Sequence, residues 1–222
     1  MAKPVTITDV AKAARVHAST VSRVLNPGTH GRVTAAVARR VTEIAKRLGY
    51  RPNAFAAGLR TKRSRTVGIL LPDIANPIFP PIVRAIESAL DAVGYIAVLA
   101  NTDNDDEREA MVVDRMAARH VDGLVLATVR RDDQIVETCR RLSIPVVLIN
   151  RTLTTDAASS VSNDDAAGMA LAVDHLVSLG HRRIAHIAGP RNVSTGIERR
   201  RGFSQAMARH GLKPLRDLIV ST

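Results

Sequence analysis

The sequence of 222 residues predicts two fold classes in one chain: a small all-α head, followed by an α/β domain built on parallel sheet. Apolar residues recur at helical spacing through roughly the first fifty positions. From Thr66 onward, short apolar strands alternate with amphipathic helices, which is typical of an α/β domain. Charge divides in the same region. Residues 1–66 hold 14 of the 32 lysines and arginines but only 2 of the 21 aspartates and glutamates, a net charge of +12, whereas the remainder has a net charge of −1.

Three short helices are predicted in the head. Thr6 is a candidate N-cap of the first helix, with Asp9 three residues later as a variant of the capping box. A tight connection at Arg15–Ala18 separates the first helix from the second, and the third is capped by Thr34 and ends at Gly49. The apolar stripes are Ile7, Val10, Ala11 and Ala14 in the first helix; Val21, Val24 and Leu25 in the second; and Val37, Val41, Ile44, Ala45 and Leu48 in the third.

Two crossed helices with a third to bury them make a helix-turn-helix domain. The second helix leaves a polar face of hydroxyls and one arginine, which suit base edges and phosphates: Ser19, Thr20, Ser22 and Arg23. The basic charge of the head suits neutralisation of phosphates. The alternative interpretation is a basic surface that is merely solvated.

The α/β part begins after the basic linker 61–65. Its strands are continuously apolar, which indicates parallel sheet buried on both faces. The predicted strands are Thr66–Leu71, Tyr95–Ala100, Gly123–Ala127, Val146–Asn150, Ser160–Ser162 and Arg183–Ala188, and the predicted helices are Phe79–Val93, Arg108–Arg119, Asp132–Leu142, Asp165–Leu179 and Gly196–His210.

The chain resembles the lactose-repressor/galactose-repressor (LacI/GalR) family from about Val5 to its end. The resemblance is carried by the segments Thr6–Ala14, Ser19–Asn26 and Tyr50–Asn53. It implies a sequence-specific DNA-binding transcriptional regulator, a repressor, that binds a near-palindromic operator in double-stranded DNA as a homodimer. It also implies a two-lobed, periplasmic-binding-protein-like effector domain, through which a sugar or related small metabolite modulates operator affinity. The implied domains are 1–52 for the head, 53–66 for the hinge helix and linker, 67–163 for the first lobe and 164–222 for a partial second lobe.

The resemblance also implies which residues contact DNA. Ser19–Asn26 corresponds to the recognition helix, with Ala18, Ser19 and Arg23 facing bases and Thr20 and Ser22 near phosphates. Leu59 corresponds to an apolar wedge inserted between central base steps, although an ordinary exposed linker leucine is the alternative. The segment 53–60 is too short to be a stable helix alone, so we expect it to fold on binding. The full predicted DNA-contacting set is Thr6, Ala18, Ser19, Thr20, Ser22, Arg23, Asn26, Asn53, Ala56, Leu59 and Arg60.

The chain departs from the family pattern at several positions. Arg15 stands where the family usually has glycine in the helix-turn-helix connection, and His17 stands at the usual serine N-cap of the recognition helix. The loop 27–32 is longer, Val37-Ala38 replaces the usual Thr-Arg, and Ile197 replaces a frequent arginine. These differences are expected to tune DNA binding and the pocket.

Ligands of open α/β sheets bind beyond the carboxyl ends of the strands. The loops 71–79, 101–107, 150–155 and 189–199 are therefore the predicted pocket walls. Asp73, Asn76 and Asn150 could hydrogen-bond hydroxyls, but plain strand-end caps are an equal alternative. Phe79 could offer a ring face and Arg199 could clamp hydroxyls or a carboxylate. The predicted effector contacts are Asp73, Asn76, Ile78, Phe79, Asn150, Thr195 and Arg199.

Several other functions are not indicated. Neither a dinucleotide fingerprint, a P-loop nor a nucleophile elbow occurs, so no enzyme activity and no cofactor are expected. The acidic run 103–107 lacks the glycine of a calcium loop and is read as helix N-terminal charge. His175, His181 and His186 are read as polar surface, so no metal is expected. Cys139 has no partner within the chain and is read as a buried or half-buried structural thiol, which fits a reducing cytoplasm.

The opening residues contain no apolar signal-peptide core and no stretch could span a bilayer, so we expect no membrane and a place in the bacterial cytoplasm, on the nucleoid through DNA binding. A periplasmic sugar-binding protein is the less favoured alternative. The resemblance stops early in the second lobe, so a truncated chain is expected, and a DNA-binding module without effector response is a further alternative. Apolar faces on the helices 165–179 and 196–210 would then lack partners.

Overall fold

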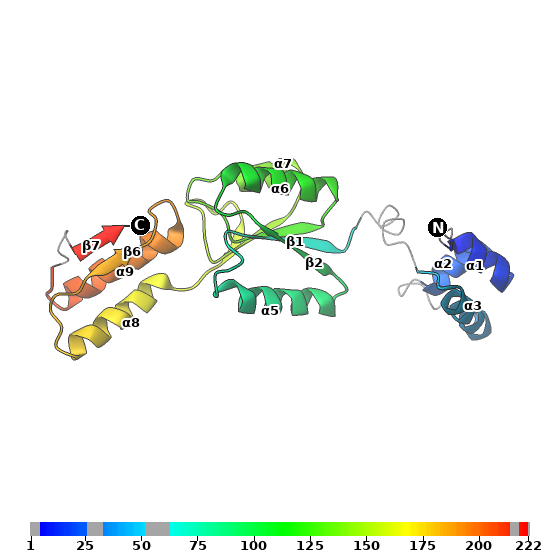
Figure 1. Ribbon diagram of the computed structural model, residues 1–222, viewed down its shortest axis with the longest axis horizontal. Helices are drawn as coiled ribbons and strands as arrows, with labels where there is room; N and C mark the ends of the chain where they lie inside the picture. The colour runs from blue at the N-terminus through cyan, green and yellow to red at the C-terminus, as the bar shows by residue number, and fades with distance from the viewer. Residues whose placement is uncertain (1–4, 26–32, 52–62, 214–217, 222) are drawn as a thin grey trace. The chain divides into compact units, whose positions relative to one another are not determined.

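The computed structural model describes residues 5–25, 33–51, 63–213 and 218–221, and the chain divides after Lys62 into two compact units. This division falls inside the segment 53–66 that the sequence assigns to hinge and linker. The first unit is the head, and the second unit is the α/β domain (Figure 1).

The head contains α1 (Ile7–Ala14), α2 (Ala18–Leu25) and α3 (Ala35–Leu48). The predicted capping box begins α1: the Asp9 N–H donates to Thr6 Oγ1 at 3.4 Å, and Asp9 Oδ2 accepts from the Thr6 N–H at 2.8 Å. Gly49 ends α3 with a φ of +66°, where glycine is favoured. The three predicted stripes form one core, whose fully buried members are Val10, Ala11, Ala14, Val21, Val24, Val41 and Ala45.

Arg15 ends α1 in the left-handed conformation, with φ +51° and ψ +49°. Its backbone N–H donates to the carbonyl of Lys12 at 3.2 Å, which closes the turn between α1 and α2. A residue with a Cβ pays about 1 kcal/mol for this conformation. This cost gives a physical reason for the glycine that the family pattern usually has at the position of Arg15.

The first lobe of the α/β domain is a five-stranded parallel sheet in the order β2-β1-β3-β4-β5. The helix α5 covers one face of this sheet, and α6 and α7 cover the other (Figure 1). The elements are β1 (Thr66–Leu71), α5 (Phe79–Ala92), β2 (Ile96–Asn101), α6 (Asp106–Ala118), β3 (Gly123–Leu126), α7 (Ile135–Arg141), β4 (Val146–Ile149) and β5 (Ser159–Val161).

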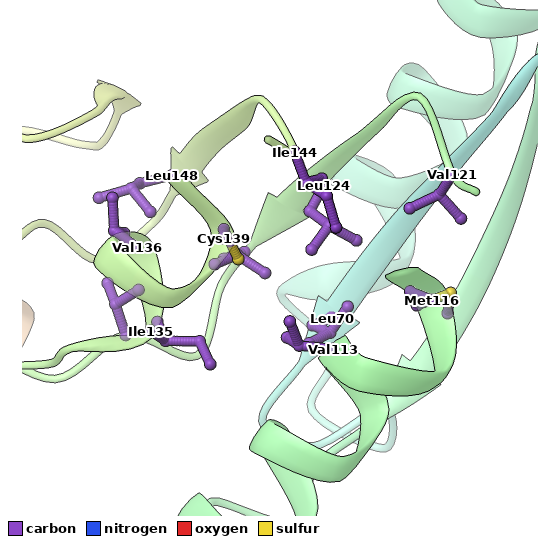
Figure 2. Close-up of a cluster of buried hydrophobic side chains, with 12 residues drawn as sticks. Leu70, Val113, Met116, Val121, Leu124, Ile135, Val136, Cys139, Ile144 and Leu148 are labelled. Carbon is purple, nitrogen blue, oxygen red and sulfur yellow. The ribbon is translucent and has the colours of Figure 1, made fainter. Parts of the chain in front are cut away.

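Successive side chains of β1 enter different cores. Leu70 points to the α6–α7 side, where it packs with Val113, Leu124 and Cys139 (Figure 2). The residues on either side of it, Ile69 and Leu71, lie in the core beneath α5. The prediction of strands buried on both faces is therefore confirmed for β1. Cys139 is fully buried, as predicted, and burial raises the pKa of its thiol to about 11.

Just before β1, Ser64 and Arg65 hydrogen-bond to the carboxylate of Asp122, an arrangement called the Asp122 clamp below. One carboxylate oxygen of Asp122 accepts hydrogen bonds from the Ser64 N–H at 2.8 Å and the Ser64 hydroxyl at 3.1 Å. The other oxygen accepts from the Arg65 N–H at 3.1 Å. The end of the linker is thereby fixed to the loop before β3.

The second lobe is smaller. Its helices α8 (Asp165–Ser178) and α9 (Ser194–Arg209) pack together and against a two-stranded parallel sheet of β6 (His186–Ala188) and β7 (Ile219–Ser221) (Figure 1). Its buried apolar members are Val173, Ile184, Phe203, Ala206 and Met207.

Several predicted boundaries were wrong, and two of the differences have a clear local reason. The sequence starts a helix at Arg108, but α6 begins at Asp106 because Asp105 caps it by accepting from the Arg108 N–H at 2.8 Å. The predicted helix 132–142 begins only at Ile135, because the Asp133 carboxylate accepts from the N–H groups of Arg130 and Ile135 and holds a loop. The predicted strand 183–188 shortens to its last three residues, which form β6.

The prediction that His186 lies on the polar surface was wrong. Its side chain is 7% exposed and stacks on Phe203, with ring centroids 4.9 Å apart. Burial, followed by the positive charges of Arg200 and Arg199, lowers the pKa of His186. The alternation of the short strand β6 turns this side chain inward.

Unpartnered apolar side chains occur on part of the second lobe. On α8, Leu171 is 72% exposed, and on β6, Ile187 is 78% exposed. The expectation was wrong for α9, whose large apolar side chains Phe203 and Met207 are buried against the rest of the lobe. None of the helices in residues 5–25, 33–51, 63–213 and 218–221 has the length and apolar character needed to span a bilayer.

Candidate nucleic-acid interface and ligand site

The polar face predicted for the second helix lies at the surface of α2. Ser19 and Arg23 are exposed, and Ala18, Thr20 and Ser22 are partly exposed, whereas Val21 and Val24 are buried in the head. Since helical residues three and four apart share a face, Ser19, Ser22 and Arg23 form one continuous polar surface. This surface carries two hydroxyls and one guanidinium, the groups that read base edges and phosphates.

His17 caps the beginning of α2. Its carbonyl accepts from the Thr20 N–H at 2.9 Å, and its Nδ1 accepts from the Ser19 N–H at 3.2 Å. The Ser19 hydroxyl lies 2.8 Å from the same nitrogen. A backbone N–H can only donate, so Nδ1 is the acceptor and the neutral ring carries its proton on Nε2. His17, which stands where the family usually has serine, therefore acts as the N-cap of α2 and also orients the Ser19 hydroxyl.

We expect His17→Ala to lower the stability of α2 by about 1 kcal/mol, because an alanine leaves the Ser19 N–H without its acceptor. Amide hydrogen exchange of peptides from α2 should accelerate about fivefold. His17→Ser, which restores a hydroxyl acceptor, should exchange at close to the original rate. Equal rates in the original chain and in His17→Ala would contradict the capping role.

Other predicted DNA contacts have different positions. Thr6 donates its hydroxyl proton to Asp9 Oδ2 at 2.7 Å as part of the cap of α1. The remaining predicted contacts lie outside the described residues: Asn26, Asn53, Ala56, Leu59 and Arg60.

The first predicted wall of the ligand site is a capped turn after β1. Asp73 Oδ1 accepts from the Ala75 N–H at 2.9 Å, and Asn76 Oδ1 accepts from the Ile78 N–H at 3.1 Å. Both oxygens make the turn bonds of the capping alternative, and contact with a ligand stays a prediction for both residues. Ile78 is 36% exposed and lies just before α5.

The other predicted ligand residues are dispersed. The Phe79 ring is 2% exposed and packs in the core beneath α5, so it offers almost no face to a ligand in this structure. Asn150 has a φ of +63°, and its N–H donates to the Val161 carbonyl at 2.9 Å. Thr195 is buried at the start of α9, and Arg199 Nε donates to Asp165 Oδ1 at 2.7 Å.

Sequence reasoning missed the loop after β3, residues 127–134. This loop carries Thr128 and Arg130, whose positions directly beyond a strand end could have identified them. Thr128 donates its hydroxyl proton to the buried carboxylate of Glu109, and the Thr128 carbonyl accepts from Arg151 Nη1 at 2.9 Å. Burial raises the pKa of Glu109 to about 7.

Arg130 and Arg151 connect this loop to the turn before α6. Arg151 Nη2 donates to Asn104 Oδ1 at 3.1 Å, and Arg130 Nη2 donates to the Asn104 carbonyl at 2.6 Å. Arg130 also pairs with Asp106 at 2.9 Å. The carboxyl ends of β2, β3 and β4 are therefore joined by one polar network.

A hollow of about 610 Å³ opens next to this network. It lies between the loop after β3 and the loop after β6, which are joined by the Arg131 N–H donating to the Asn192 carbonyl at 2.9 Å. A second link is the Thr152 N–H, which donates to Ser194 Oγ at 2.9 Å. The hollow has the polar lining of a site for a hydroxylated molecule. Its lining residues are Asp106, Arg130, Arg131, Asp132, Asp133, Gln134, Arg191 and Asn192, and none of the seven predicted effector contacts is among them.

Across the part of the chain that the structure describes, no group of three or more histidine, cysteine, aspartate or glutamate side chains is arranged to hold a metal ion. The arrangement offers both hydrogen-bond donors and acceptors at the carboxyl ends of parallel strands.

Comparisons with known proteins divide the chain in the same way as the fold. Residues 6–53 match the family model of bacterial regulatory proteins of the lacI family. Residues 64–222 match the model of periplasmic binding proteins and the sugar-binding domain of the LacI family.

Individual relatives match nearly the whole chain. The ribose operon repressor of Halalkalibacterium halodurans is 38% identical over 202 residues, covering 91% of this chain and 59% of the relative. Catabolite control protein A of Priestia megaterium is 34% identical over 220 residues, covering 97% of this chain and 64% of the relative. The chain thus spans less than two thirds of the length of these two relatives.

Solved structures give the same comparison. The Lac repressor dimer bound to operator and the anti-inducer ONPF matches with a TM-score of 0.83 at 29% identity, covering 99% of this chain and 65% of that one. The complex of the transcriptional regulator CelR with cellobiose matches with a TM-score of 0.67 at 31% identity, covering 98% of this chain and 65% of that one. These structures confirm the predicted fold class of a helix-turn-helix head with a periplasmic-binding-protein-like domain.

Proposed function

Because this chain belongs to the LacI family of bacterial regulatory proteins, we propose that it is a transcriptional repressor that binds operator DNA and responds to a small sugar-like molecule. The observation that carries the proposal is the exposed polar face of α2 on a strongly basic head. The named relatives are regulators rather than enzymes, and we propose binding without catalysis as the activity of this chain.

The proposed DNA complex is a homodimer on a near-palindromic operator. Each head places α2 in the major groove, with Ala18, Ser19 and Arg23 toward bases and Thr20 and Ser22 toward phosphates. The hinge residues Asn53, Ala56, Leu59 and Arg60 lie outside the described residues, and their contacts, with the Leu59 wedge, are proposed from family resemblance. The protein is proposed to act in the bacterial cytoplasm, on the nucleoid.

The coupling between ligand and DNA is proposed to run through the linker. A ligand between the loops after β3 and β6 would favour one relative placement of the two lobes. The Asp122 clamp on Ser64 and Arg65 supports this proposal, because it ties the end of the linker to the first lobe. Linkage then requires DNA and ligand to alter each other's affinity by the same factor.

A titration of the 222-residue chain with DNA from upstream of its own gene tests the proposal. A shuffled duplex of equal length is the control, and both titrations are repeated at several salt concentrations. A preference of about a thousandfold or more for the upstream DNA is expected of a specific regulator. Equal and steeply salt-dependent binding to both duplexes would instead identify a nonspecific DNA-binding module.

Arg23→Ala should cost about 1 to 3 kcal/mol on the operator and relax base preference, because an exposed α2 guanidinium reads a base edge. Arg63→Ala is the matched change in the basic linker 61–65, and through the loss of one positive charge it should weaken binding to all duplexes alike and lower the salt slope by about 1. Electrophoretic mobility shifts with operator and shuffled duplexes measure both effects. An equal loss on the two duplexes for Arg23→Ala would remove its reading role.

A further inference from the structure

Four arginines line one hollow of about 460 Å³ in the α/β domain. Arg131 comes from the loop after β3, Arg191 from the loop after β6, and Arg200 and Arg201 from α9. No carboxylate is among the lining residues, which are completed by Gly196, Ile197 and Ser204. The lining therefore has a strong excess of positive charge.

Protein groups satisfy these guanidinium groups only in part. Arg201 pairs with Glu198 at 2.5 Å, and Arg131 Nε donates to Thr154 Oγ1 at 3.1 Å. Among the described residues, Arg191 and Arg200 form no ion pair, and Nη1 of Arg200 is buried without any hydrogen-bond acceptor. A buried charged donor without an acceptor is costly, and such a group calls for a missing partner.

The beginning of α9 adds to the positive potential. Val193, its N-cap residue, has no side-chain oxygen to accept the first N–H groups of the helix. Gly196 in the first turn of α9 lines the hollow. A Cβ there would lie 2.1 Å from the Pro190 carbonyl oxygen, so only glycine fits and the backbone itself forms this part of the lining. The positive end of a helix favours an anion.

The hollow of about 610 Å³ described above shares Arg131 and Arg191 with this one. Its other lining groups include the carboxylates of Asp106, Asp132 and Asp133, which repel an anion but accept hydrogen bonds from hydroxyls. The two hollows together therefore suit a molecule with an oxyanion at one end and hydroxyls at the other.

We propose that the arginine-lined hollow binds the oxyanion group of a sugar derivative, either a phosphate ester or a carboxylate. This inference rests on the proposed function, because it gives the chemical class of the effector. Guanidinium groups bind both oxyanions through paired, charge-assisted hydrogen bonds. Arg191 and Arg200 supply the unpaired donors, and the neighbouring hollow holds the hydroxyls.

Calorimetric titration of the 222-residue chain with inorganic phosphate tests the oxyanion site. Arg191→Gln and Arg200→Gln should each weaken phosphate binding about tenfold or more, as expected for the loss of a hydrogen bond between charged groups. Arg182→Gln is the matched control, since Arg182 is exposed in the same lobe and does not line the hollow. Its phosphate affinity should stay unchanged.

Arg191 lies on an exposed loop, so its variant tests the site without risk to the core even if Arg200→Gln unfolds the lobe. Equal phosphate affinity in Arg191→Gln, Arg182→Gln and the original chain would overturn the proposal and place phosphate on the basic head. Absence of any phosphate binding at millimolar concentration would overturn it as well.

Titrations with glucose 6-phosphate, gluconate and glucose then identify the source of the oxyanion. Tighter binding of glucose 6-phosphate or of gluconate than of glucose, lost in Arg191→Gln, is the expected result and distinguishes ester from carboxylate. Equal binding of all three would contradict an oxyanion requirement. These titrations contain no DNA, so they can fail while operator binding succeeds, and the reverse.

Discussion

Replacing Gly202 with alanine is expected to destabilise the second lobe by about 3 kcal/mol. A Cβ at this position would lie 2.5 Å from the carbonyl oxygen and 2.6 Å from the Cα of Ala166. Both atoms belong to the backbone of α8, so no side chain can rotate away. The helices α8 and α9 would have to separate, and the buried contacts of Val173 and Phe203 would loosen with them.

Gly168→Ala is the matched control in the same pair of helices. Its Cβ would meet nothing within 4 Å, so alanine should stabilise α8 by about 0.5 to 1 kcal/mol through lower backbone entropy in the unfolded chain. Amide exchange of peptides from α8 and α9, followed by mass spectrometry, measures the lobe separately from the head. We expect exchange about a hundredfold faster in Gly202→Ala and slower in Gly168→Ala.

Unchanged exchange in Gly202→Ala would mean that α8 and α9 do not approach as closely as the structure indicates. The arginine-lined hollow is tested separately, because its lining includes residues of α9 but none of α8.

Local sequence signals predicted the head well because its determinants lie within a few residues of one another. Thr6 and Asp9 are three residues apart, and their reciprocal hydrogen bonds form within one helical turn. The role of His17 was not predicted, since an imidazole acceptor at an N-cap has no strong propensity signal. The parallel sheet was predicted from the continuous apolar character of the strands and their alternation with helices, whereas the order of the strands in the sheet was not predicted.

The ligand site could be predicted only in outline. The rule that places sites beyond strand ends points to the edge of the sheet that carries the polar network, but it does not pair Thr128 with Glu109, which lies 19 residues away in the sequence. No periodicity connects positions so far apart. The sequence places Phe79 at the first residue of a helix, and this position does not show whether its ring is exposed. The ring is buried because it packs with the β1 side chains Ile69 and Leu71.

Glu109→Gln should abolish a pH dependence of about 3 kcal/mol in the stability of the first lobe. The Glu109 side chain is 5% exposed, and burial raises its pKa to about 7 from the ordinary 4.5, while the Thr128 hydrogen bond acts in the opposite direction. The nearby carboxylates of Asp133 and Asp106 raise the pKa further, and Arg130 lowers it. Burial is the dominant cause, because the charged form loses its hydration.

The sign follows from proton uptake. Between pH 4.5 and about 7 the folded state keeps the proton on Glu109, whereas the unfolded state releases it. The free energy of unfolding therefore falls as pH rises through this window, and the loss is complete above about pH 7. Glutamine cannot ionise, so the variant should gain about 3 kcal/mol relative to the original chain between pH 4.5 and 8, whatever its stability at the acidic end.

Cys139 provides a readout confined to the first lobe, since it is the only cysteine, is fully buried and lies in the α6–α7 core (Figure 2). Chains equilibrated in urea at each pH receive a brief pulse of thiol reagent at one fixed alkaline pH, and the labelled fraction gives the unfolded population. Glu107→Gln is the control, because its exposed side chain stays in water in both states. A difference between Glu109→Gln and the original chain that stays constant from pH 4.5 to 8 would show that folding does not raise the pKa of Glu109. Glu109 would then carry a negative charge at neutral pH beside Thr128, and the potential of the adjoining hollow would be more negative than its lining alone implies.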